Sequence, residues 1–170
     1  MISLSDVNVL PIDSFVDRFG DVAEHSPWVA EAAGALRPFA SREAMVLAFA
    51  QAVRTAPRSL QLKLVNAHPD LAGRAARAGS MAADSVKEQA GAGLDTLTDE
   101  EYARFTDLND RYRARFGFPF ILAVKGATKH RILESFAERV GNAPAVEFEN
   151  ALGQIARIFR FRIEDRVSPD

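Results

Sequence analysis

The residue best placed for acid–base chemistry in this sequence is His68, within the run Ala67-His68-Pro69-Asp70. Because a proline disfavours helical geometry in the residue before it, His68 is predicted to lie at the C-terminal end of a helix. The helix dipole favours a protonated imidazolium there, and a histidine fixed at such an end can act as a general acid or base. Spacing alone favours a structural alternative, in which the imidazole binds the last carbonyl groups of the helix.

A second set of polar side chains lies in residues 85–89. Ser85, Glu88 and Gln89 are spaced i, i+3 and i+4, so they share one face of a helical turn. They offer a hydroxyl, a carboxylate and an amide, which suit a polar heterocycle with several N–H and C=O groups. Taken alone, the motif is more typical of an exposed polar turn.

Arg162 is the arginine whose position is most informative. It follows Ile158 by four residues and Phe159 by three, so it falls on the apolar face of the last predicted helix. Arg160 lies about 200° around the helix from it and is expected to face outward. A buried unpaired charge is very costly, so Arg162 needs a partner. That partner is either an acid such as Glu88 or a substrate carboxylate bound bidentately.

The other two histidines are less informative. His25 precedes Ser26-Pro27, a pair typical of an N-cap followed by proline at the first helical position, and Trp28 is expected in the core. His130 lies in the basic run 129–131, which predicts a solvated charged face.

Helices must position these residues, because strand signals are weak along the whole chain. Helix starts are predicted at Ser26-Pro27, Ser41, Ser59, Thr98, Thr128 and Pro144, with a short helical insert near Ser85–Gln89. Gly117 and Gly141 are expected to end two of these helices. The pattern predicts an all-α protein with seven or eight helices in a single domain over residues 1–170.

Two irregular stretches interrupt the helical pattern. Residues 72–97 are rich in alanine and glycine and too long for a bundle loop, so they form either a flexible linker or a segment wrapped against a site. Within them, residues 72–93 are expected to be helical near 85–89 and otherwise irregular and mobile. Residues 116–124 are apolar but interrupted by Gly117 and Pro119, and their backbone groups must find partners, among which a ligand is one option.

Composition excludes several classes of function. The 170 residues carry a net charge of −2, so nothing favours nucleic acid or an anionic membrane as a partner. The chain has no cysteine and only three histidines, which excludes thiol chemistry and makes a metal site unexpected. The first residues do not resemble a signal peptide and no apolar run is long enough to span a bilayer, so a cytoplasmic protein is expected.

Four runs occur together in an order and spacing found in one family. They are Glu24–Val29, His68–Gly73, Ser85-x-x-Glu88-Gln89 followed by Ala92-Gly93-Leu94, and Phe116–Ile121. Over roughly residues 10–167 the chain resembles the 2-oxo-4-hydroxy-4-carboxy-5-ureidoimidazoline (OHCU) decarboxylases, which complete the route from urate to (S)-allantoin.

The resemblance implies an all-helical, cofactor-free enzyme that is usually a homodimer. His68 would be the catalytic acid and Glu88 its partner. Substrate would be held by Pro69, Ser85, Gln89 and Arg162, and by the segment Phe120, Ile121, Leu122, Ala123 and Val124. The family's C-terminal arginine lies in a Leu-Arg-Leu pattern, which Phe161-Arg162-Ile163 replaces here. Arg160 is the alternative, although helix geometry favours Arg162.

Two other functions remain open on the sequence. One is a helical interaction module that has lost the chemistry, although such a module has no need of the polar side chains at positions 68, 88, 89 and 162. The other is a related decarboxylase acting on another ureido or imidazoline acid. If the chain is the decarboxylase, His68, Glu88 and Arg162 should converge on one pocket.

Overall fold

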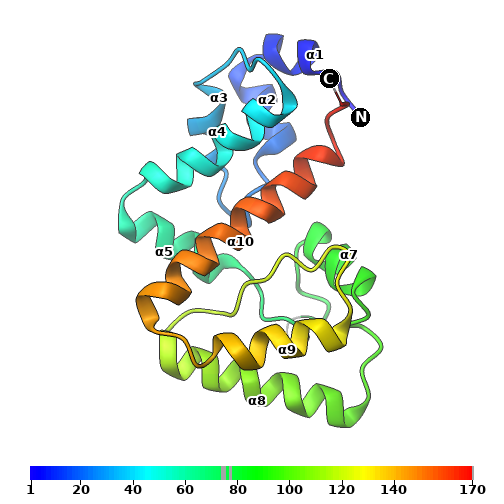
Figure 1. Ribbon diagram of the computed structural model, residues 1–170. Helices are drawn as coiled ribbons and strands as arrows, with labels where there is room; N and C mark the ends of the chain where they lie inside the picture. The colour runs from blue at the N-terminus through cyan, green and yellow to red at the C-terminus, as the bar shows by residue number, and fades with distance from the viewer. Residues whose placement is uncertain (74–75, 77, 170) are drawn as a thin grey trace. The chain divides into compact units, whose positions relative to one another are not determined.

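The computed structural model describes residues 1–73, 76 and 78–169, and this part of the chain is helical (Figure 1). Its helices are α1 (Leu4–Val9), α2 (Ile12–Phe19), α3 (Trp28–Gly34), α4 (Arg42–Thr55), α5 (Arg58–Ala67), α7 (Ala83–Gly91), α8 (Asp99–Phe116), α9 (Lys129–Arg139) and α10 (Pro144–Glu164). Among the described residues the sole β-type pairing is an isolated bridge between Ile2 and Val167. The all-α prediction is confirmed, and α1 and α2 are short helices that the pattern did not indicate.

Side-chain caps fix several of these helices where the sequence predicted them. The Ser41 and Thr128 hydroxyls each accept the backbone N–H three residues further on. At the start of α8, Thr98 and Glu101 form a complete capping box. The same helix ends at Gly117, whose φ of 76° lies in the left-handed region that favours glycine.

The start of α3 differs from the prediction. Ser26 is not an N-cap, because α3 begins at Trp28 and no side-chain cap bond is made there. The Ser26 hydroxyl instead donates to the Glu24 carbonyl oxygen at 2.8 Å, so it stabilises the turn that precedes the helix. Trp28 is half-buried rather than part of the core. Ser59 is likewise the second residue of α5 and not its cap.

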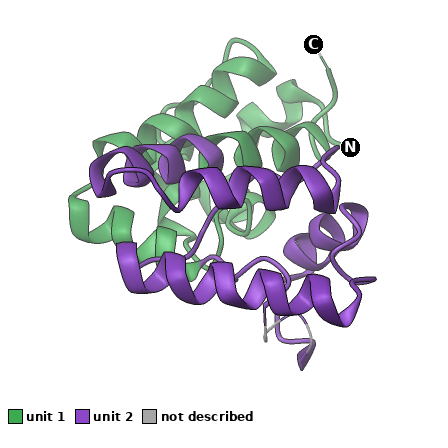
Figure 2. Cartoon of the chain, turned by 60° about the horizontal axis from the view of Figure 1, so that its bottom comes forward, with its two compact units in different colours: residues 1–67, 155–170 green, residues 68–154 purple. Residues whose placement is uncertain are grey.

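Two compact units make up the chain (Figure 2). The first contains residues 1–67 and 155–170, and its core is built on aromatic rings. The Phe15 and Phe19 ring centroids lie 5.0 Å apart, and Phe49 and Phe159 meet edge to face at 6.1 Å. Compactness does not test independent folding, so the single domain over residues 1–170 stays a prediction.

The second unit contains residues 68–154, and its core includes the apolar segment that follows α8. Phe120 stacks on Phe136 of α9 with centroids 3.9 Å apart, and Tyr112 of α8 meets Phe120 edge to face at 5.4 Å. Phe118 in turn packs edge to face against Phe148 of α10. Alternate aromatic residues therefore anchor a non-helical stretch within the core, as its apolar composition requires.

The expected character of residues 72–93 is confirmed in part. Helix α7 contains the predicted insert 85–89. The remainder of that run includes positions 74, 75 and 77, which lie outside the described residues. No helix in the described part of the chain is long and apolar enough to cross a membrane.

Candidate active site

His68 directly follows the last residue of α5, as the His-Pro dipeptide predicts. Its side chain is only 5% exposed. The residues after it form a short loop, 69–73, before the chain continues toward α7. A buried imidazole at the start of a fixed loop has the restricted geometry that directional proton transfer needs.

The Gln89 side chain holds this loop to α7. Its Oε1 accepts the Ala72 N–H at 2.9 Å, and its Nε2 donates to the Asp70 carbonyl oxygen at 3.2 Å. Ala72 has a φ of 50°, in the left-handed region that residues other than glycine rarely adopt. The hydrogen bond from Ala72 to Gln89 therefore stabilises a conformation that the sequence disfavours.

Helix α8 holds the same loop from a second direction. The Asn109 Nδ2 donates to the Leu71 carbonyl oxygen at 2.9 Å, and Arg113 Nε lies 2.9 Å from Asp70 Oδ1. Asn109 is buried, so its bond is shielded from solvent. Together with Gln89, these two residues fix three successive positions beyond Pro69.

Ser85, Glu88 and Gln89 all lie on α7, at the predicted i, i+3 and i+4 spacing. Ser85 and Gln89 are buried, and Glu88 is half-exposed. The structure thus joins the α7 residues to the loop after His68 through the amide of Gln89. A direct contact of these residues with substrate stays a prediction.

Two cavities of about 280 Å³ each adjoin this loop, near the lower end of the ~300–1,000 Å³ range of small-molecule sites. Lining residues of the first include Ala72, Met81, Val86, Gln89, Leu94 and Tyr102, and those of the second include Pro69, Asp70, Tyr102, Thr106, Asn109 and Arg113. Both cavities lie within residues 68–154. The loop after His68 therefore borders open space as well as packed side chains.

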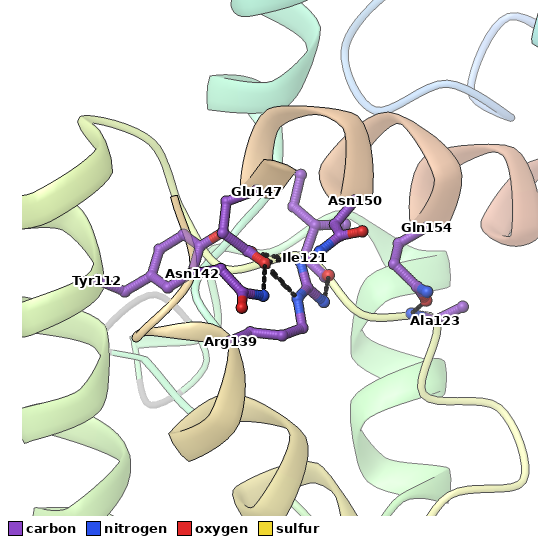
Figure 3. A network of polar contacts seen from close by, with 8 residues as sticks. All are labelled: Tyr112, Ile121, Ala123, Arg139, Asn142, Glu147, Asn150 and Gln154. Atoms are coloured by element: carbon purple, nitrogen blue, oxygen red, sulfur yellow. Dashed lines mark hydrogen bonds and ion pairs between the residues drawn. The ribbon is translucent and has the colours of Figure 1, made fainter. Parts of the chain in front are cut away.

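The segment 120–124 is non-helical and largely buried, and Leu122 is its one half-buried residue. Its backbone is bonded by two side chains (Figure 3). Arg139 Nη1 donates to the Ile121 carbonyl oxygen at 2.8 Å, and the Ala123 N–H donates to Gln154 Oε1 at 3.0 Å. The expectation that this backbone needs partners beyond secondary structure is confirmed at these two positions.

A buried ion pair fixes Arg139. Arg139 Nη2 lies 2.9 Å from Glu147 Oε2, and Glu147 has no exposed surface. Tyr112, Asn142 and Asn150 also donate to the Glu147 carboxylate (Figure 3). The Glu147 carboxylate thus accepts hydrogen bonds from four side chains, which compensate its buried charge.

These bonds set the protonation states in the network. Burial by itself would raise the pKa of Glu147, but the hydrogen bonds from Arg139, Tyr112 and the two asparagines outweigh it and hold that pKa below its ordinary value. Burial, with the bond to Glu147, raises the pKa of Tyr112 well above its usual range. Glu147 therefore remains an anion and Tyr112 a neutral donor.

Arg162 is buried on the inner face of α10, as predicted, at 3% exposure. Its Nη1 lies 2.9 Å from Glu24 Oε2, so Glu24 is an acid that pairs with it. Glu24 is also buried and belongs to the motif before α3, although no sequence pattern indicated this pair. Arg160 faces outward and pairs with Glu43, as helix geometry predicted. A substrate contact for Arg162 stays a prediction.

The predicted site residues divide between the two units. His68, Pro69, Ser85, Glu88, Gln89 and residues 120–124 belong to residues 68–154, whereas Arg162 belongs to the other unit. The convergence of His68, Glu88 and Arg162 on one pocket therefore stays a prediction. His25 and His130 are both exposed. No group of three or more acidic, histidine or cysteine side chains suited to a metal ion occurs among the described residues.

Sequence patterns did not indicate Arg139, Glu147 and Gln154, which hold the backbone of segment 120–124 directly or through the buried ion pair. One signal was available for Arg139. It follows Ile132 by seven residues and Phe136 by three, so it falls on the apolar face of α9 by the reasoning that singled out Arg162. No comparable signal exists for Gln154, whose partner is a backbone group distant in sequence.

Comparison with known proteins places this arrangement in a family. The family model for OHCU decarboxylase matches residues 8–164. A 2-oxo-4-hydroxy-4-carboxy-5-ureidoimidazoline decarboxylase of Haloferax volcanii is 43% identical over 169 residues, covering 99% of this chain and 98% of that protein. The uric acid degradation bifunctional protein PucL of Bacillus subtilis is 41% identical, and the match covers 33% of its length.

A solved structure agrees with the sequence comparisons. The crystal structure of an (S)-allantoin synthase superimposes with a TM-score of 0.80 at 31% identity. That match covers 99% of this chain and 54% of the synthase. With the family model and a full-length relative in agreement, the chain belongs to the OHCU decarboxylase family.

Proposed function

We propose that this protein decarboxylates 2-oxo-4-hydroxy-4-carboxy-5-ureidoimidazoline to (S)-allantoin in urate degradation. The observation that carries the proposal is the match, over almost all of both chains, to the decarboxylase of Haloferax volcanii. The loop 69–73 after His68 supports it, because two hydrogen bonds of Gln89 join this loop to α7 and so connect two of the family's motifs.

The proposed decarboxylation depends on how the protein positions the substrate, because the substrate itself can accept the electron pair. Loss of carbon dioxide breaks the bond at ring carbon 4, and its electron pair forms a double bond to carbon 5. The C=N pair at carbon 5 moves onto the ring nitrogen, which takes up a proton. The substrate therefore carries its own electron sink, and the protein has to orient the carboxylate and stabilise the developing charge.

The second half of the reaction sets the stereochemistry. The hydroxyl at carbon 4 becomes a carbonyl as its proton leaves, and carbon 5 accepts a proton on one face. We assign the delivery of that proton to His68, whose fixed position at the start of the loop suits a directional donor. Glu88 would stabilise the imidazolium. Pro69, Ser85, Gln89, Arg162 and residues 120–124 would hold the substrate.

The proposal is tested by supplying substrate at the moment it forms. Urate is oxidised and hydrolysed by the upstream enzymes in the presence of the purified protein, and allantoin is followed by circular dichroism. We expect rapid formation of optically active (S)-allantoin. Unchanged, spontaneous decay to racemic allantoin would contradict the proposal and would favour an inactive module or a decarboxylase for another ureido acid.

The expected assembly follows from the resemblance. We propose a homodimer in the cytoplasm, without nucleic-acid or membrane partners, consistent with the net charge of −2. Sedimentation at low micromolar concentration tests the dimer, and a single species of monomer mass would contradict it.

A further inference from the structure

Two side chains bond to the backbone of segment 120–124, at the alternate residues Ile121 and Ala123. Residues in an extended chain present their N–H and C=O groups to alternate edges, so positions 121 and 123 share an edge and 122 faces the other. The chain between α8 and α9 runs here without helical turns (Figure 1). The bonds from Arg139 to Ile121 and from Ala123 to Gln154 therefore occupy the same edge.

The opposite edge carries the N–H and C=O of Leu122. Neither group has a hydrogen-bond partner within the described part of the chain. Leu122 is half-buried, whereas its neighbours on both sides are buried. Backbone donors and acceptors in such places are normally paired with protein, water or ligand. The Leu122 peptide groups thus form an adjacent donor and acceptor that the protein itself leaves unused.

The Arg139 side chain, which bonds to this edge, is itself held in place by several contacts. Arg139 is bonded to the fully buried Glu147 through both Nε and Nη2. Its guanidinium also lies 4.4 Å from the centre of the Phe120 ring, in cation–π geometry. Gln154 projects from α10 toward Ala123 (Figure 3). Side chains held in this way can fix the direction of a neighbouring backbone group.

We propose that Arg139 and Gln154 are positioning residues for the reaction. By occupying the Ile121–Ala123 edge, they orient the Leu122 N–H and C=O to bind a paired C=O and N–H of a ureide substrate. The inference rests on the proposed function, in which residues 120–124 contact the substrate. Beyond that contact, Arg139 and Gln154 would set the direction of the backbone, and the Leu122 peptide groups would bind the substrate.

Gln154 gives the cleaner variant, because a single hydrogen bond joins it to the segment. Gln154→Leu keeps the size of the side chain and removes the acceptor, whereas Gln154→Glu keeps an oxygen for the Ala123 N–H. We expect Gln154→Leu to raise KM about tenfold while kcat stays within about threefold, and Gln154→Glu to restore KM to within about threefold of wild type. Gln51→Leu on α4 is the matched control, since Gln51 is exposed, and should leave both constants unchanged.

A second measurement uses the unaltered protein. Addition of (S)-allantoin, as a product carrying the same ureide groups, should slow hydrogen exchange of the Leu122 amide about tenfold or more. An unchanged Leu122 exchange rate at saturating (S)-allantoin would overturn the inference. So would an active Gln154→Leu with wild-type KM, or a KM raised equally in Gln154→Leu and Gln154→Glu. An inactive wild-type protein would instead contradict the proposed function, so the two failures are distinguishable.

Discussion

Replacing Glu147 by glutamine should strongly destabilise the protein, although the two side chains have nearly the same shape. Glu147→Gln keeps the size of the side chain and removes its charge. The carboxylate is fully buried and accepts hydrogen bonds from Arg139, Tyr112, Asn142 and Asn150. The variant would leave the Arg139 guanidinium in the same buried place without its counter-charge.

The expected loss follows from that geometry. Removing one partner of a buried ion pair lowers the free energy of unfolding by about 3–5 kcal/mol, a large part of the ~5–15 kcal/mol available to a domain. The pair Arg131–Glu134 on the same α9 is 79% and 64% exposed. An exposed pair of this kind contributes about 0.2–1 kcal/mol, so Glu134→Gln is the matched control.

Thermal unfolding followed by far-UV circular dichroism measures both variants. For a chain of this size we expect Tm to fall by roughly 6–20 °C in Glu147→Gln and by less than about 4 °C in Glu134→Gln. Equal, small losses in the two variants would refute the reasoning, because the buried network would then contribute no more than a surface pair.

Three further predictions concern pH and the site. The pKa of Glu147 lies below its ordinary value of 4.5 in the folded protein, so the ionised carboxylate stabilises the fold above pH 4.5 and this contribution is lost on further acidification. The difference in unfolding free energy between wild type and Glu147→Gln should therefore shrink below about pH 4.5. A constant difference in calorimetry across this pH range would contradict this prediction. Gln89→Leu removes the acceptor of the Ala72 N–H, so the loop 69–73 after His68 should be displaced and kcat/KM should fall by about 10²-fold. Wild-type kinetics in this variant would contradict a role of Gln89 in positioning the loop. Arg162→Lys keeps a positive charge opposite Glu24 but loses the planar fork, so steady-state kinetics should show a raised KM with substantial kcat at saturation, whereas loss of kcat alone would disagree.

Local chemistry explains how much of the fold could be predicted. Thr98 and Glu101 specify a helix start through a capping box, and Gly117 specifies a helix end, within a few residues of sequence. The His-Pro dipeptide likewise places His68 at the end of α5 without any tertiary information. Ser26 is not a cap because α3 begins at Trp28 with Pro27 at the N-cap position, and the Ser26 hydroxyl donates to the Glu24 carbonyl oxygen in the preceding turn.

Long-range pairing explains what the sequence did not reveal. Periodicity predicted that Arg162 points inward, but Glu24, which pairs with it, lies far away in the chain, and spacing gave no indication of that pair. The same limit applies to the bond between Gln154 and Ala123. In each case one residue's orientation is a local property, whereas the identity of its partner depends on the packing of distant helices.

The kinetics and product stereochemistry of His68→Asn, measured against wild type, show whether His68 donates the proton to carbon 5. The helix end would lose at most ~1–2 kcal/mol, so the variant should fold and melt close to wild type. The circular dichroism of allantoin formed from freshly generated substrate gives kcat, KM and enantiomeric excess together. For His68→Asn we expect kcat to fall by about 10²–10⁴-fold and enantioselectivity to be lost. A variant with near-wild-type kcat and only a raised KM would contradict it, and Glu88 would become the first candidate for the proton donor.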